Sequence, residues 1–200
     1  KTMSERPLIF VTRRIADAAL DRLREQADLR LWREDLPPTY AALQREIAEV
    51  EGILCLITEQ VDAGMIDAAP NLKVILDPNE RWETVAETKY RLDRLMKLDN
   101  VLCLEDPIPR WMLIEYRELR AYSRIPIILH VSLPYILQGQ RVEDAILALK
   151  QQAVDGFNFN AGLAQYQQLD HIAHAANLPS WHGSEVDLGI LEAMYLHQVM

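Results

Sequence analysis

The chain has 200 residues, of which half are hydrophobic and about a quarter are charged, as is ordinary for a globular protein of one domain. Its net charge of −9 argues against a nucleic-acid partner, because binding to phosphates needs a basic surface. No apolar run approaches the roughly 20 residues of a membrane-spanning helix, so we expect no membrane partner. We expect Met3 to be the natural initiator, and because no signal peptide follows it we expect a cytoplasmic protein.

Short apolar runs alternate with amphipathic helical patterns along the chain. The runs expected to form β-strands are 8–11, 29–32, 53–57, 72–76, 101–104, 125–129, 156–160 and 180–182. A helical pattern follows each run, and the last of these patterns covers 188–197. Strict alternation of strand and helix predicts an α/β fold with parallel strands and right-handed crossovers.

Eight βα units in series are typical of a closed (β/α)8 barrel like that of triosephosphate isomerase, the TIM barrel, and no linker rich in glycine or serine divides the chain. We therefore expect residues 1–200 to form a single α/β domain, closed by pairing of strand 8–11 with the strand near Trp181. An open flavodoxin-like parallel sheet is one alternative. A homo-oligomer is another, in which strands unpaired at a sheet edge pair or swap between chains.

The first part of the chain contains the segments FVTRRI (10–15), EDLPP (34–38), LITEQVD (56–62) and AAPNLKVI (68–75). In order and spacing they resemble the beginning of D-2-hydroxyacid dehydrogenases of the glyoxylate/hydroxypyruvate reductase type. The resemblance implies that residues 1–75 form a flavodoxin-like segment. It ends after Ile75, and the family's catalytic residues have no counterpart here. The chain also lacks the GxGxxG pattern that cradles a dinucleotide phosphate, so we expect no NAD binding.

The second part contains the segments LDPNERW (76–82), LEDPIP (104–109) and WHGSEVD (181–187). These resemble strand ends in the barrel of the enolase superfamily, in its mandelate racemase/muconate lactonizing branch. The resemblance covers residues 76–200 and implies barrel strands three to seven. The first two barrel strands, the amino-terminal capping domain and the last strand of that family have no counterpart.

This second resemblance implies that Asp77 and Glu105 are two of three carboxylates that bind Mg²⁺. The third ligand is expected after the strand that ends at Leu129, where this sequence has His130. Imidazole is a softer ligand than a carboxylate, so we expect any Mg²⁺ to be held weakly and no other cofactor. His182 matches the family's general base at the end of the seventh barrel strand. The partner base, from a lysine pair, is replaced by 53–57, which contains no lysine.

Both motif sets are incomplete, so the sequence favours a chimera of the two families, engineered or selected as a folded scaffold without evolved catalytic function. The alternative is an enzyme, a magnesium-dependent acid-sugar dehydratase or racemase with residual activity. Asp77, Glu105 and His182 favour the enzyme. The replaced third carboxylate and the missing base oppose it.

Overall fold

The computed structural model describes residues 6–55, 59–60, 62–131 and 141–183. Its chain forms two compact units, Lys1–Val74 and Ile75–Met200. The boundary between them lies one residue from the junction at 75/76 that the two resemblances predict. Met3, the 184–187 end of the third enolase-like motif and the helix expected at 188–197 lie outside the described residues. The single domain over 1–200 stays a prediction.

The first unit contains a three-stranded sheet in the order β2-β1-β3, with both pairings parallel. Its elements are β1 (Leu8–Val11), α1 (Asp17–Gln26), β2 (Asp28–Leu31), α2 (Tyr40–Ile47), β3 (Gly52–Leu54) and α3 (Ala63–Ala68). The side chain of Thr39 accepts the N–H of Ala42 and so caps α2, as expected for threonine at this position. Phe10, Leu43, Ile47 and Met65 lie at the centre of the apolar core of this unit.

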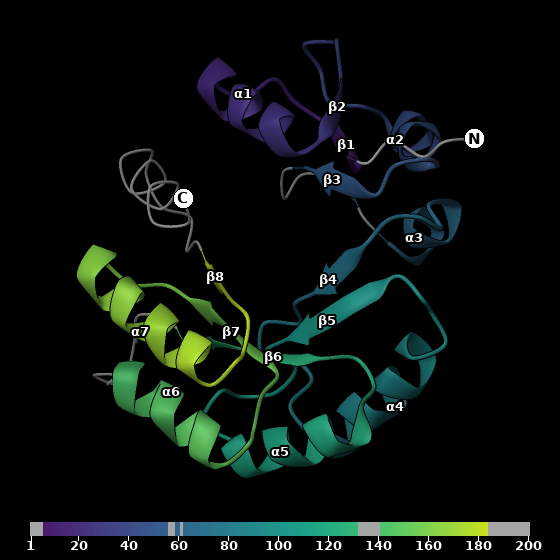
Figure 1. Cartoon of the computed structure of the whole chain (residues 1–200). Helices are drawn as coiled ribbons and strands as arrows, with labels where there is room; N and C mark the ends of the chain where they lie inside the picture. The colour runs from purple at the N-terminus through teal and green to yellow at the C-terminus, as the bar shows by residue number, and fades with distance from the viewer. Residues whose placement is uncertain (1–5, 56–58, 61, 132–140, 184–200) are drawn as a thin grey trace. The chain divides into compact units, whose positions relative to one another are not determined.

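The second unit contains a five-stranded sheet whose strands follow chain order, β4-β5-β6-β7-β8. Its strands are β4 (Val74–Leu76), β5 (Val101–Glu105), β6 (Ile127–Val131), β7 (Gly156–Phe159) and β8 (Ser180–His182), and its helices are α4 (Val85–Leu95), α5 (Leu113–Tyr122), α6 (Arg141–Lys150) and α7 (Leu163–Ala175). The sheet curls into a half-barrel with α4–α7 along its outer side (Figure 1). The core between sheet and helices contains Phe157, Phe159, Tyr116 and Leu104, all fully buried.

The closed eight-stranded barrel expected from the sequence is not what the described residues form. β1 pairs with β2 along one edge and with β3 along the other. A strand has only two hydrogen-bonding edges, so β1 has none left for β8, which itself pairs with β7. The expected pairing of 8–11 with the strand near Trp181 is therefore wrong. The α/β class and the parallel strands are confirmed. No helix in the described part of the chain is long and apolar enough to cross a membrane.

Candidate functional site

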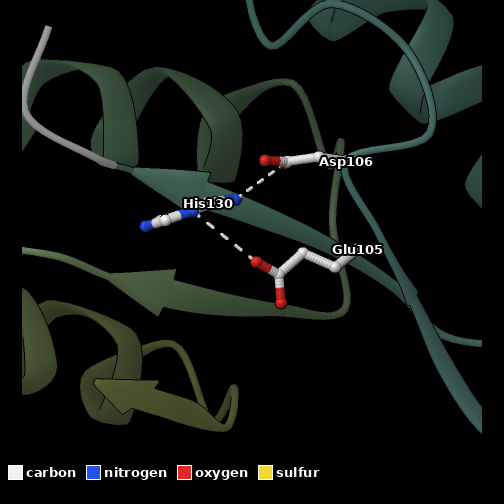
Figure 2. Close-up of side chains that lie close together, drawn as sticks. All are labelled: Glu105, Asp106 and His130. Carbon is white, nitrogen blue, oxygen red and sulfur yellow. Dashed lines mark hydrogen bonds and ion pairs between the residues drawn. The ribbon is translucent and has the colours of Figure 1, made fainter. Parts of the chain in front are cut away.

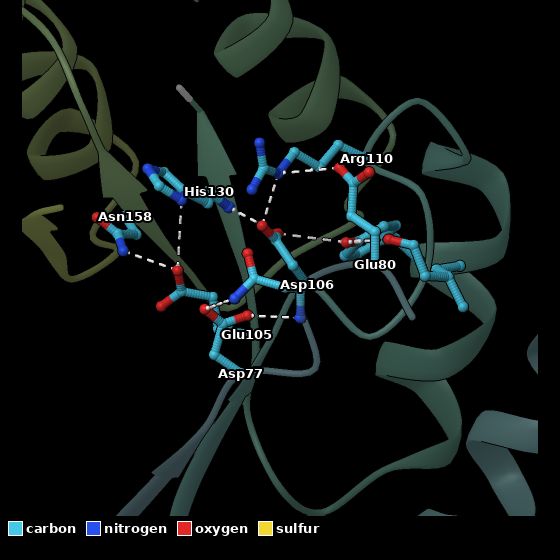
Figure 3. Close-up of polar contacts among 10 residues, drawn as sticks. Asp77, Glu80, Glu105, Asp106, Arg110, His130 and Asn158 are labelled. Carbon is cyan, nitrogen blue, oxygen red and sulfur yellow. Dashed lines mark hydrogen bonds and ion pairs between the residues drawn. The ribbon is translucent and has the colours of Figure 1, made fainter. Parts of the chain in front are cut away.

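Polar side chains gather where the strands of the half-barrel end. Asp77 follows β4 directly, Glu105 is the last residue of β5, His130 lies near the end of β6, Asn158 lies in β7 and His182 ends β8. The carboxyl ends of neighbouring parallel strands meet at one edge of a sheet, which is where barrel enzymes place their catalytic groups. Figure 3 shows Asp77, Glu105, His130 and Asn158 together at this edge.

Glu105 is the most central of these groups, and its residue is only 4% exposed. Its Oε1 accepts a hydrogen bond from Asn158 Nδ2 at 2.7 Å. Burial raises the pKa of Glu105 to about 7; the Asn158 hydrogen bond lowers it, and the negative charge of Asp77 raises it. A buried carboxylate surrounded by further carboxylates is a group that gains from a nearby cation.

His130 faces Glu105 from the neighbouring strand (Figure 2). Its Nδ1 lies 3.6 Å from Glu105 Oε1, which is too long for a hydrogen bond. Burial, followed by electrostatic interactions with Arg110 and then with His182, lowers the pKa of His130 to about 4, so the His130 imidazole is neutral near pH 7. Its other ring nitrogen, Nε2, is buried and has no hydrogen-bond partner among the described residues.

Asp106 is a third acidic group at this edge, and the sequence did not single it out. Its φ of 40° is in the left-handed region, so the chain turns sharply after β5. Its Oδ2 lies 2.6 Å from Arg110 Nε, and its Oδ1 accepts the backbone N–H of His130 at 2.9 Å. Burial raises the pKa of Asp106 to about 6, although Arg110 lowers it. Ligand atoms of Glu105, Asp106 and His130 all lie within 4.8 Å of one another.

Asp77 lies beside this group at the end of β4. One of its oxygens accepts the backbone N–H of Asn79 and the other accepts the Asn79 side-chain amide, both at 2.8 Å. Burial raises the pKa of Asp77. Its charge in turn raises the pKa values of Glu105 and Asp106, which places Asp77 within electrostatic reach of both.

His182 lies two strands away from His130 at the same edge. Its ring stacks on Tyr166, with ring centroids 4.8 Å apart and an interplanar angle of 27°. Its Nδ1 lies 2.5 Å from the carbonyl oxygen of Gly183, and its Nε2 lies 3.4 Å from that of Ala161. The stack and these carbonyls fix the plane of a partly buried imidazole at the mouth of the half-barrel.

The residues of this edge fit a divalent cation. Burial raises the pKa of Glu105 to about 7 and that of Asp106 to about 6, although the positive charge of Arg110 lowers both. The buried atoms His130 Nε2 and Asn158 Oδ1 have no hydrogen-bond partner in the described part of the chain. Unsatisfied buried polar atoms are rare in proteins and point to a ligand or ion.

The second unit is thus a half-barrel with carboxylates and histidines at its strand ends. Residues 58–200, well over half of the chain, match the family model "Enolase C-terminal domain-like". The chain belongs to this family. The match begins ahead of the boundary at 75/76 that the sequence resemblance gave.

Solved structures with this fold include a mandelate racemase/muconate lactonizing family protein from Azoarcus sp. EbN1, 22% identical, with a TM-score of 0.60 over 100% of this chain and 49% of that one. A dipeptide epimerase from Cytophaga hutchinsonii, solved with Mg and the dipeptide D-Ala-L-Val, is 17% identical, with a TM-score of 0.58 over 100% of this chain and 51% of that one. At these identities the likeness shows the fold alone. The chain spans about half the length of these proteins.

A stretch of 71 residues is 44% identical to a glyoxylate reductase from Thermofilum pendens, covering 35% of this chain and 21% of that protein. Both resemblances found in the sequence therefore have matches among known proteins. A deliberate or selected chimera stays a prediction. Family membership favours the enzyme alternative over the scaffold without function.

Proposed function

We propose that the chain removes the proton next to the carboxylate of a small acid, using a divalent cation held at the strand ends and His182 as general base. One observation carries this proposal. Buried carboxyl groups of raised pKa, a neutral buried imidazole and a second imidazole share one edge of the half-barrel. Perturbed groups of this kind cluster at functional sites.

Asp77 and Glu105 are the carboxylates proposed to hold the cation. A cation bound there would supply positive charge beside the substrate carboxylate, which lowers the cost of removing the adjacent proton. Asn158 supports this arrangement because its amide holds Glu105 in place from β7, two strands away in the sheet. Asp106 supports it differently, since its bond to the backbone of His130 fixes the end of β6.

His182 is the proposed base because histidine is the side chain that most often moves protons at neutral pH. The Tyr166 stack orients its ring, so the proton acceptor is held in a defined direction before substrate arrives. By sequence position the resemblance would put the family's second base at 53–57, and this segment contains no lysine. A site with one base favours exchange on one face, or loss of a β-hydroxyl from an acid sugar as water if His182 passes the proton it has taken to the leaving oxygen. It disfavours rapid two-base racemisation.

The test is incorporation of deuterium at the α-carbon of a panel of acid sugars in heavy water, with a divalent cation added. We expect exchange above buffer, and its loss by roughly 100-fold or more in His182→Ala, the scale of general-base catalysis. Glu105→Gln should also abolish it. The matched control is His174→Ala, which removes an exposed histidine on α7. Absence of exchange in a chain folded by circular dichroism would restore the scaffold interpretation.

A further inference from the structure

We propose that His130 is itself a metal ligand, and that it gives the site a preference for a borderline transition-metal ion such as Co²⁺ or Zn²⁺ over Mg²⁺. The proposal rests on the proposed function for the position of the cation, between Asp77, Glu105 and the end of β6. It goes beyond that function by assigning the kind of ion.

The position of His130 is the first support. Its Nδ1 and Glu105 Oε1 are 3.6 Å apart without forming a hydrogen bond. Ligand bonds to Zn²⁺ are about 2.0–2.2 Å long, so two atoms that share one such ion lie roughly 3–3.6 Å apart. The observed separation therefore suits a shared cation better than direct contact. The two side chains come from adjacent parallel strands, which hold this separation without an ion.

The second support is the tautomer that this geometry selects. His130 is only 8% exposed, and its Nδ1 is the ring nitrogen that faces Glu105. A neutral imidazole has one lone pair and one N–H. With the proton on Nε2, the lone pair of Nδ1 faces the carboxylate oxygen of Glu105, and a cation between these two electron-rich atoms would relieve their repulsion.

Asp106 is a poorer ligand than its position suggests. Arg110 already compensates its charge at 2.6 Å, and the backbone of His130 uses its other oxygen. We therefore assign Asp106 as a positioning residue. It holds the backbone of β6 so that the imidazole of His130 faces Glu105.

Ligand chemistry decides the choice of ion. Mg²⁺ requires oxygen ligands in near-octahedral geometry and gives up its water reluctantly. Imidazole suits Zn²⁺, Ni²⁺, Cu²⁺ and iron, and mixed sets of histidine and carboxylate are common in zinc sites. Two carboxylates and one imidazole form such a mixed set. The substitution of imidazole for the third carboxylate therefore shifts selectivity without removing the site.

The test measures binding of metal alone, without substrate, to the full chain. Dissociation constants for Mg²⁺ and Co²⁺ are obtained by calorimetry for the wild type, His130→Asp and His130→Asn. Most sites of nitrogen and oxygen ligands bind Co²⁺ more tightly than Mg²⁺, so the diagnostic quantity is the change in the ratio of the two constants. We expect the preference for Co²⁺ to fall by roughly tenfold or more in both variants. In His174→Ala the ratio should stay unchanged.

A spectroscopic readout identifies the ligand directly. Electron spin echo modulation of bound Cu²⁺ reports imidazole nitrogen, and we expect this signal to survive His182→Ala and to vanish in His130→Asn.

Two outcomes overturn the proposal. One is a ratio of the Mg²⁺ and Co²⁺ dissociation constants that is the same in wild type and folded variants, and the other is a nitrogen signal that persists without His130. Absence of any cation binding overturns it together with the cation role in the proposed function. Selective binding of Co²⁺ with no α-proton exchange supports His130 as a metal ligand and contradicts the proposed function alone. If His130→Asp fails to fold, His130→Asn and the wild-type nitrogen signal decide.

Discussion

Arg110 and Asp106 form an ion pair after β5, with Arg110 Nε 2.6 Å from Asp106 Oδ2. The other oxygen of Asp106 accepts the backbone N–H of His130. The pair therefore connects the loop after β5 to the backbone of β6, where the proposed metal ligand lies. Because Asp106 is fully buried, it depends on Arg110 for compensation of its charge.

Replacing Arg110 by methionine should destabilise the second unit. A buried carboxylate without its partner costs about 3–5 kcal/mol, and the partial exposure of Arg110 places the expected loss at the lower end of that range. Denaturant unfolding at pH 7 measures this loss. At pH 5 the loss should shrink, because the pKa of Asp106, already raised to about 6 by burial, rises further without Arg110 and the carboxyl becomes neutral. Arg117→Met, at an exposed position on α5, is the control. An equal loss at both pH values would contradict this explanation.

Glu105 should make the folded chain less stable as pH rises. Burial raises its folded pKa from its usual 4.5 to about 7, so between these values the folded state binds a proton that the unfolded state releases. Its contribution to the free energy of unfolding therefore falls as pH rises through this window. Without metal, Glu105→Gln should stabilise the chain at pH 8 by about 2–3 kcal/mol and have little effect at pH 4.5. The comparison is with Glu118→Gln, which removes an exposed carboxylate from α5. A stabilisation that does not vary with pH would rule out this assignment.

Gly183 approaches Asn158 so closely that a side chain does not fit. A Cβ at Gly183 would lie 2.3 Å from Asn158 Oδ1. Gly183→Ala must therefore displace the amide that donates to Glu105, at a cost of about 1–3 kcal/mol for overpacking. The pKa of Glu105 should rise further, because this hydrogen bond lowers it. NMR titration of the Glu105 carboxyl carbon measures the shift. Gly162→Ala is a matched control, since a Cβ there meets nothing within 4 Å.

The sequence located the strands well but not the way in which they pair. Apolar runs and helical periodicity are local signals, and each expected strand has a counterpart in the described structure. Sheet order depends on contacts between segments that are distant in the sequence. Counting eight βα units gives no information on those contacts. The order β2-β1-β3 is the beginning of the flavodoxin-like order. The dehydrogenase resemblance of residues 1–75 was therefore the better guide to this sheet.

The sequence predicted the residues of the candidate site that follow the strand ends. It missed the residue at which the backbone departs from regular strand geometry. Asp77 and Glu105 stand at the ends of apolar runs, so the sequence placed them at one edge. Asp106 follows Glu105 directly, and alternation along a strand would send it to the opposite face. Its positive φ overrides that alternation, and no local sequence pattern predicted this backbone conformation. His130 lies inside β6 because this strand ends two residues later than expected, at Val131.

The last prediction concerns the core of the first unit. Phe10 in β1 is fully buried, and its ring meets Trp32 edge to face with centroids 6.5 Å apart. Phe10→Ala removes a large side chain from the central strand of this sheet, so we expect a loss of about 3–5 kcal/mol. Native-state hydrogen exchange of backbone amides in β1, β2 and β3 measures the loss where it occurs. Leu36→Ala is the control, because Leu36 is 75% exposed and its truncation should change exchange little. Unchanged exchange in the three strands of Phe10→Ala would show that Phe10 does not stabilise this sheet as its burial indicates.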